Sequence, residues 1–129
     1  MIEEVTPPEA AKLLENDNTV LLDVRSEMEY SYVGHPTGAI HIALQEPPDW
    51  QVDPAFVERV TVAIPDKDTT VLTLCRSGAR SMLAAELLQS AGYSKAINIR
   101  EGFEGDRDGQ KQRGKVSGWR FHELPWEQS

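Results

Sequence analysis

Residues 70–81 read Thr70-Val71-Leu72-Thr73-Leu74-Cys75-Arg76-Ser77-Gly78-Ala79-Arg80-Ser81. The apolar, β-branched run 70–74 predicts a buried strand, and apolar positions at helical spacing over 83–91, before Gly92, predict a helix. The order is strand, tight loop and helix, with Cys75 at the carboxyl end of the strand. Open α/β sheets bind their ligands at that end, so we expect the functional site there.

The loop combines the features that activate a thiol. Cys75 is the single cysteine of the chain. Backbone N–H groups of the loop and of the first helical turn converge on an anion, and two arginines add positive charge. This setting favours the thiolate, the nucleophilic form, and predicts that solvent reaches the sulfur. Cys75 is therefore the candidate catalytic residue. The candidate substrate-binding residues are Arg76, Ser77, Gly78, Ala79, Arg80 and Ser81.

Individual loop residues suggest separate roles. Gly78 allows a positive φ and a close approach of the backbone to the sulfur. Ser77 or Ser81 can donate a hydroxyl hydrogen bond to the sulfur, and Arg80 is expected to lie further inside than Arg76. The alternative for Cys75 is an inert buried thiol, which is how most lone cysteines behave.

The rest of the chain alternates helices and strands. A capping box with proline at the first helical position, Thr6-Pro7-Pro8-Glu9, opens a helix, and Ser26 to Glu29 form a second capping box before a short helix. Asp53-Pro54 is expected to cap another helix, which includes Phe56, Val57 and Val60. Further strands are expected at 19–24, 39–42 and 95–99, with a turn at 34–38. The alternation predicts the α/β class with a mostly parallel sheet.

Two positions beside the predicted strand 19–24 are candidates for supporting the site. Asp23 stands at its carboxyl end and either pairs with Arg25 or a loop arginine, or caps the following turn. Both possibilities remain open at this stage. Glu29 is interpreted as a capping residue rather than a catalytic acid.

Composition limits the function. The chain has 129 residues and a net charge of −8, which argues against a general binder of nucleic acid or of anionic membranes. A lone cysteine excludes an internal disulfide and a thiolate metal cluster. The three histidines are too scattered for a metal site, and Lys115 stands where the calcium-loop-like segment 104–109 needs a glutamate. Neither a signal peptide nor a membrane-spanning run is visible, so a cytoplasmic protein is expected.

The chain changes character after residue 107. Residues 105–117 are polar and glycine-rich, whereas 118–126 are aromatic. We expect a domain over 1–107 and a tail over 108–129, with Trp119 and Trp126 packed back onto the domain.

Four ordered features resemble the single-domain rhodaneses, the sulfurtransferase family. They are Leu21-Leu22-Asp23-Val24-Arg25 with Glu29-Tyr30, Gly34-His35 with Gly38-Ala39-Ile40, the loop 75–81, and Ile99-Arg100-Glu101-Gly102-Phe103. The resemblance covers roughly residues 2–107. Two departures are Pro36-Thr37 in place of an Ile-Pro-like pair, and Glu101 where the family often has glycine.

The resemblance implies a five-stranded, mainly parallel sheet with helices on both faces. It also implies that Cys75 takes the outer sulfur of thiosulfate or a similar small anionic donor as a persulfide. A thiol, a protein cysteine or cyanide then accepts that sulfur. No metal or organic cofactor, nucleic acid or membrane is expected, and the protein is expected to be a monomer or homodimer.

Two rival functions share these features. One is a protein-partnered sulfur carrier or interaction module with little thiosulfate turnover. The other is a cysteine-dependent phosphatase or arsenate reductase. Those enzymes place their arginine six positions after the cysteine, whereas Arg80 stands at the fifth position and Ser81 at the sixth. The shorter loop favours a single sulfur over a tetrahedral phosphoryl group.

Overall fold

The computed structural model, which describes residues 2–128, is built around one parallel sheet of five strands. The strand order is β1-β6-β5-β2-β4, and every neighbouring pair is parallel. The α/β class and the five-stranded sheet are therefore confirmed. The strands are β1 (Glu3–Val5), β2 (Thr19–Asp23), β4 (Ile40–His41), β5 (Thr70–Leu74) and β6 (Lys95–Ile99).

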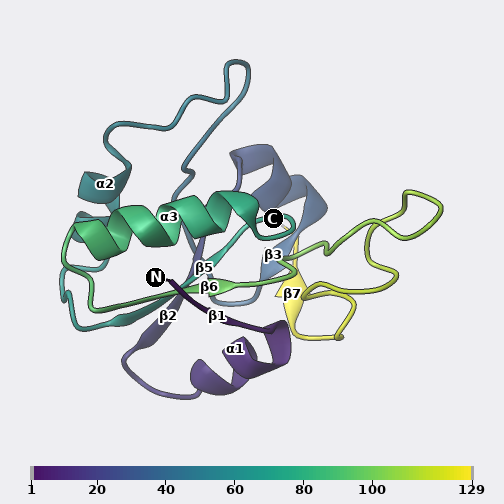
Figure 1. Ribbon diagram of the computed structural model, residues 1–129, viewed down its shortest axis with the longest axis horizontal. Coiled ribbons are helices and arrows are strands. Elements are labelled where there is room, and N and C mark those ends of the chain that lie inside the picture. The colour runs from purple at the N-terminus through teal and green to yellow at the C-terminus, as the bar shows by residue number, and fades with distance from the viewer. Residues whose placement is uncertain (1, 129) are drawn as a thin grey trace.

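Helices cover both faces of the sheet. α2 (Phe56–Ala63) and α3 (Ala79–Ser90) lie on one face, and α1 (Pro7–Leu13) lies on the other (Figure 1). The predicted capping box of α1 is present: the Glu9 N–H donates to Thr6 Oγ1, and the Thr6 N–H donates to the Glu9 carboxylate at 2.8 Å. The expected cap of α2 at Asp53-Pro54 is wrong: Ala55 is the N-cap and has no side-chain cap hydrogen bond. The Asp53 carboxylate accepts from the Ala55 N–H at 2.9 Å, in the turn before the helix begins at Phe56.

The alternation of side chains along the strands produces a separate core on each face. The core beneath α2 and α3 includes Leu22, Val24, Phe56, Val60, Val71, Ala84 and Leu88. The core beneath α1 includes Val5, Ala10, Leu21, Leu72, Ile97, Phe103 and Trp119. Cys75 belongs to the first core, so the loop that it opens is anchored beneath α2 and α3.

The segment between β2 and β4 differs from the prediction. The Ser26–Glu29 capping hydrogen bonds form, but the helix that follows, η1 (Glu29–Val33), winds as a π-helix. Part of the predicted turn 34–38 is a short strand, β3 (His35–Pro36), which pairs antiparallel with β7 (Trp126–Glu127). The turn prediction was wrong at these two positions because their partner comes from the tail, which local sequence does not reveal.

The tail lies against the domain. Trp119 is buried, and its indole N–H donates to the Pro125 carbonyl at 2.9 Å. Trp126 is 42% exposed and meets the Phe103 ring edge-on, with ring centroids 5.9 Å apart. Glu101 adopts a φ of +73° and accepts hydrogen bonds from the Gly118 N–H at 3.0 Å and from the His122 ring at 2.9 Å. The boundary after residue 107 stays a prediction.

Candidate active site

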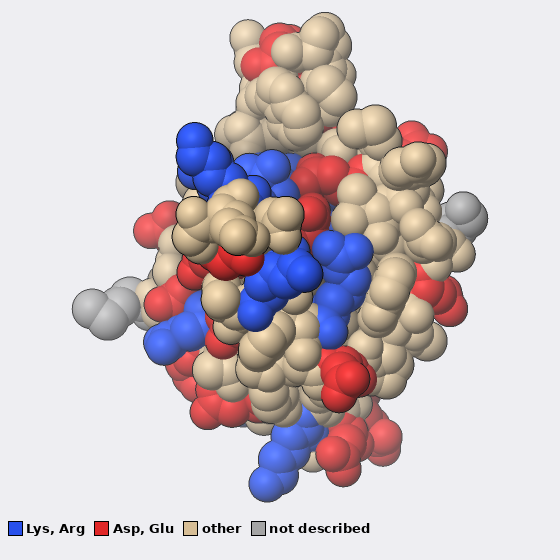
Figure 2. Space-filling view, turned by 90° about the vertical axis from the view of Figure 1, so that its right-hand side faces the viewer, with Lys and Arg blue, Asp and Glu red and all other residues tan. Residues whose placement is uncertain are grey.

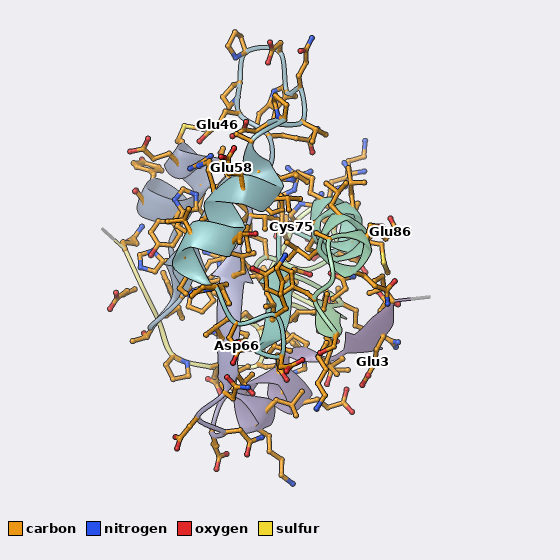
Figure 3. The ribbon with its side chains drawn as sticks, turned by 90° about the vertical axis from the view of Figure 1, so that its left-hand side faces the viewer. Glu3, Glu46, Glu58, Asp66, Cys75 and Glu86 are labelled. Atoms are coloured by element: carbon orange, nitrogen blue, oxygen red, sulfur yellow. The ribbon has the colours of Figure 1, made fainter. Side chains whose placement is uncertain are left out.

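The loop places Cys75 where the sequence predicts it, directly after β5 and before α3 (Figure 3). Gly78 precedes the first residue of α3 with a φ of +120°, a conformation that L side chains rarely adopt. Its N–H donates to Cys75 Sγ at 3.1 Å. A backbone dipole therefore points at the sulfur, the position at which negative charge is stabilised.

Cys75 is nevertheless deeply placed, with 1% of its surface exposed. The sequence predicts a thiol open to solvent, and the structure corrects that expectation, because the run 70–75 continues the core of β5. A reagent reaches the sulfur only after neighbouring side chains move. Burial alone would equally suit an inert core thiol, so the case for function depends on the polar groups around the sulfur.

Ser81 contacts the sulfur from the start of α3, at 3.3 Å between Oγ and Sγ. Its hydroxyl has one proton, and its shortest contact, 2.5 Å, is to the Asn98 side-chain oxygen. The Asn98 amide nitrogen faces two acceptors, the Glu4 carboxylate and the Gly78 carbonyl. The Asn98 side-chain oxygen therefore faces Ser81 and accepts the hydrogen bond from its hydroxyl. The Ser81 hydroxyl thus lies within hydrogen-bond distance of the sulfur, as expected, but the Asn98 oxygen is its nearer acceptor.

The other loop positions contribute less to the sulfur's surroundings. The Ser77 hydroxyl makes no hydrogen bond within residues 2–128, and Ala79 is an exposed residue at the start of α3. Arg76 is exposed, as expected for the outer of the two arginines.

The Arg80 side chain is more buried than that of Arg76, as predicted, but it is bound to Glu29. Its guanidinium donates two hydrogen bonds to the Glu29 carboxylate, at 2.8 and 2.9 Å. Burial of Glu29 opposes its charge, but the Arg80 hydrogen bonds and charge, with further hydrogen bonds from Ser26, hold the Glu29 pKa at about 2. The Glu29 hydrogen bonds in turn raise the pKa of Arg80 against the effect of burial, and the nearby Cys75 and Asp23 add to that rise. Glu29 is both a capping residue and the partner of Arg80.

Asp23 and Arg25 form a second, fully buried ion pair. Arg25 Nε and Nη2 donate to the two Asp23 oxygens at 2.9 and 2.6 Å, and Nη2 also donates to the Gly34 carbonyl at 2.6 Å. Asp23 therefore pairs with Arg25 rather than with a loop arginine, and it also caps the following turn, because its carboxylate accepts from the Arg25 backbone N–H at 3.1 Å. The Arg25 guanidinium lies over the Phe103 ring, 4.5 Å from its centroid. The Phe103 N–H in turn donates to the Cys75 carbonyl at 2.8 Å, so Phe103 connects the Asp23–Arg25 pair to the loop.

Gly102 and Asn98 are structural contributors that reasoning from local sequence missed. A Cβ on Gly102 would lie 2.5 Å from the Arg76 carbonyl carbon and oxygen, so only glycine fits behind the loop. The N–H groups of Glu104 and Gly105 both donate to that same carbonyl oxygen, at 3.0 and 3.1 Å. An asparagine inside the apolar run 95–99 is the signal that could have revealed Asn98, because buried amides need partners.

A hollow of about 450 Å³ opens beside the loop. Its charged lining consists of two arginines and two glutamates, so the formal charges cancel. Lys and Arg side chains gather near the centre of one face of the molecule, with acidic groups close to them (Figure 2). The lining residues are Ser26, Met28, Glu29, Val33, Trp50, Arg76, Arg80 and Glu104.

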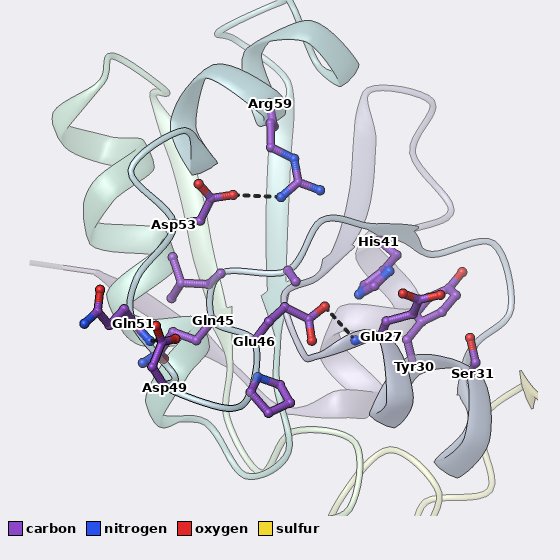
Figure 4. Close-up of a pocket in the computed structure, with 13 residues that line it drawn as sticks. Glu27, Tyr30, Ser31, His41, Gln45, Glu46, Asp49, Gln51, Asp53 and Arg59 are labelled. Carbon is purple, nitrogen blue, oxygen red and sulfur yellow. Dashed lines mark hydrogen bonds and ion pairs between the residues drawn. The ribbon is translucent and has the colours of Figure 1, made fainter.

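A second hollow, of about 560 Å³, has a different character (Figure 4). Asp49 and Gln51 line it, whereas Trp50 between them lines the first hollow. Four carboxylates face this second hollow, and neither loop arginine does. It therefore does not suit an anionic substrate of Cys75. The carboxylates belong to Glu27, Glu46, Asp49 and Asp53.

Comparison with known proteins agrees with this geometry. The model of the rhodanese-like domain matches residues 6–107. The chain belongs to the rhodanese-like family. The crystal structure of Rv0390 from M. tuberculosis superposes on this rhodanese-like chain with a TM-score of 0.89 and 36% identity, covering 98% of each chain.

Two relatives differ in what is known of them. An uncharacterized protein of Rickettsia rickettsii, the RP600 homologue, is 34% identical over 119 residues, covering 89% of this chain and 88% of the relative. The thiosulfate sulfurtransferase GlpE of Actinobacillus pleuropneumoniae is 28% identical over 102 residues, covering 79% and 83%. No helix within residues 2–128 of this rhodanese-like protein has the length and apolar character to cross a membrane.

Proposed function

We propose that the protein is a sulfurtransferase that moves sulfane sulfur from thiosulfate or a similar donor to a thiophilic acceptor through a persulfide on Cys75. The observation that carries this proposal is the Gly78 N–H, held at 3.1 Å from Cys75 Sγ. A structural thiol needs no such donor, whereas an anionic sulfur does. The name of the GlpE relative supports the same activity.

The reaction divides into two displacements. The Cys75 thiolate attacks the outer sulfur of thiosulfate, the bond between the two donor sulfurs breaks, and its electron pair leaves with sulfite. The acceptor then attacks the terminal sulfur of the Cys75 persulfide, and the thiolate is released again. With cyanide as acceptor the product is thiocyanate. Both steps balance in atoms and electrons without a redox partner, so the proposal includes no cofactor.

The loop residues have distinct roles in this proposal. The Gly78 N–H supports the negative charge on the sulfur, and Ser81 limits the position of Sγ from the other side at 3.3 Å. Arg76 and Arg80 receive the donor, with Ser77 and Ala79 completing the loop backbone. The Asp23–Arg25 pair supports the loop through Phe103. A reducing compartment such as the cytoplasm suits a single free thiol.

A second candidate is a sulfur carrier that exchanges sulfur with a partner protein and turns over thiosulfate slowly. The burial of Cys75 and the Arg80–Glu29 pair favour it, because both hinder a free dianion from reaching the sulfur. The phosphatase alternative is weaker. Such phosphatases place their arginine six positions after the cysteine, whereas Arg80 stands at the fifth position and Ser81 at the sixth.

Steady-state kinetics test the proposal. Thiocyanate formation from thiosulfate and cyanide should give parallel double-reciprocal lines, the pattern of a covalent intermediate. Cys75→Ser should abolish the reaction. As a control, the variant must be shown to fold like the wild type, so that the loss of activity is not due to misfolding. Hydrolysis of a phosphate ester without thiocyanate formation would contradict the proposal, and slow turnover with thiosulfate but rapid turnover with a persulfidated protein would favour the carrier.

A further inference from the structure

The hollow beside the loop has a charge distribution that bears on the donor it accepts. Glu29 holds Arg80 through two hydrogen bonds, and the two side chains are only 12% and 21% exposed. Glu29 thus offsets the positive charge that Arg80 brings to the loop. Arg76 and Glu104, which line the same hollow, add one formal charge of each sign. The lining therefore has no excess positive charge to attract a dianion.

Apart from Ser26, whose hydroxyl donates to Glu29, the remaining wall of the hollow is apolar. Met28, Val33 and Trp50 line it, and Met28 and Trp50 expose 65% and 43% of their surface. The Arg80 guanidinium faces the Trp50 ring at 5.8 Å from its centroid. An inorganic anion gains nothing from such a wall, whereas an organic group attached to the sulfur buries apolar surface against it.

We infer that Glu29 is a specificity-determining residue, which neutralises Arg80 so that the site favours sulfur donors with a single negative charge and an apolar organic group over dianions such as thiosulfate. This inference rests on the proposed function and narrows its donor class. Organic thiosulfonates and organic persulfides have this chemistry.

The charge balance of the reaction gives the physical reason. A thiosulfonate, R–SO₂–S⁻, transfers its outer sulfur to the Cys75 thiolate: a new S–S bond forms, the old one breaks, and its electron pair leaves with the sulfinate R–SO₂⁻. This reaction gathers two negative charges beside the loop, whereas the reaction with thiosulfate gathers three. Because the two arginines and two glutamates of the lining cancel formally, no excess cation offsets the additional negative charge that thiosulfate brings, and like charges at short range repel strongly in a partly buried site.

Three sulfur donors, each with cyanide as acceptor, distinguish the effect of charge from that of apolar contact. Thiosulfate is a dianion, whereas methanethiosulfonate and benzenethiosulfonate are monoanions that differ in the size of their apolar group. For the wild type, we expect kcat/KM to rise in that order. Glu29→Gln keeps an oxygen for the Ser26 hydrogen bonds but removes the charge. We expect Glu29→Gln to lower the KM for thiosulfate about three- to tenfold and the KM for methanethiosulfonate by clearly less. At high salt, the effect of the substitution on KM should become the same for both donors.

A second pair of variants tests the apolar wall independently. Trp50→Ala should reduce the preference for benzenethiosulfonate over methanethiosulfonate about threefold or more. Tyr32→Ala, at an exposed aromatic residue that does not line the hollow, should leave that preference unchanged. Glu58→Gln on the exposed side of α2 is the charge-matched control for Glu29→Gln.

The outcomes distinguish this inference from the function on which it rests. Equal changes in KM for all donors in Glu29→Gln would overturn the inference, because they would indicate a structural role for Glu29. A wild type that uses thiosulfate more efficiently than both thiosulfonates would also overturn it, with the sulfurtransferase function intact. Failure of all three donors to yield thiocyanate would overturn the function and the inference together.

Discussion

Replacement of Glu29 by glutamine should destabilise the protein in a way that depends on pH. Glu29 exchanges hydrogen bonds with Ser26 at the start of η1 and binds Arg80 with two more. Glutamine retains one acceptor oxygen, for the contacts of Ser26 and Arg80 Nη1 with Oε1, but replaces the Oε2 that accepts from Arg80 Nη2 with an amide NH2, so the substitution removes the charge and one hydrogen bond of the pair. The resulting loss of stability therefore measures the ion pair.

The magnitude follows from the pKa of Glu29, which the structure lowers from 4.5 to about 2. Such a shift corresponds to about 3 kcal/mol in favour of the charged form. Because the pair retains some contact with solvent, we expect about 2 kcal/mol at pH 7. A carboxyl with a lowered pKa stabilises the fold fully above its unfolded-state value of 4.5, and that contribution is lost as pH falls towards 2.

Urea unfolding of the wild type and of Glu29→Gln between pH 7 and pH 3 measures the difference in their free energies of unfolding. The free energies of unfolding should differ by about 2 kcal/mol, without change, from pH 7 to about pH 5, and should converge below that. Glu58→Gln should stay within about 0.5 kcal/mol of the wild type throughout. A difference for Glu29→Gln that is independent of pH, or absent at pH 7, would refute the reasoning.

Three further predictions concern the loop and its supports. Arg80→Ala should slow sulfur uptake about 10- to 100-fold, followed as the rate of persulfide formation with thiosulfate; an unchanged rate would reduce Arg80 to a scaffold residue. Gly102→Ala should lower the free energy of unfolding in urea by about 2–3 kcal/mol, because its Cβ collides with the Arg76 carbonyl; a change under about 0.5 kcal/mol would show that the backbone there yields freely. Glu101→Gly relieves a positive φ but removes the contacts to Gly118 and His122, so trypsin should cleave the tail faster; equal cleavage rates would rule out Glu101 as an anchor of the tail.

Local sequence predicts the features that depend on neighbouring residues. The capping box at Thr6 and the strand 70–74 are both where the pattern places them, because hydrogen bonds within one turn and apolar runs are properties of short segments. The position of Cys75 at the end of β5 follows directly. The resemblance to rhodaneses supplied the count of five strands, whereas the residues themselves indicated four.

The strand that the pattern missed, β1, is too short and too charged to show a period. Its two glutamates lie at the edge of the sheet, where Glu4 binds Asn98 across 94 residues of sequence. The β3–β7 pair was missed for a similar reason, since each strand has only two residues and the partners come from distant parts of the chain.

The site was predictable in its residues but not in its hydrogen bonds. The sequence shows two arginines beside a thiol, and from this it predicts an electropositive site. Only the fold reveals that Glu29, 51 positions before Arg80, neutralises one of them. In the same way, the Ser81 hydroxyl lies within hydrogen-bond distance of the sulfur, but Asn98 from β6 is its nearer acceptor. Long-range pairs of this kind depend on how strands and helices pack.

The central claim is that Cys75 carries sulfur, although the side chain is 99% hidden in the resting structure. Mass spectrometry of the intact protein after mixing with thiosulfate or benzenethiosulfonate tests it most directly. We expect a gain of one sulfur atom, localised to Cys75, removed by cyanide and absent in Cys75→Ser. A wild-type protein that stays unmodified with every donor, or a Cys75→Ser variant that gains the same mass, would contradict it.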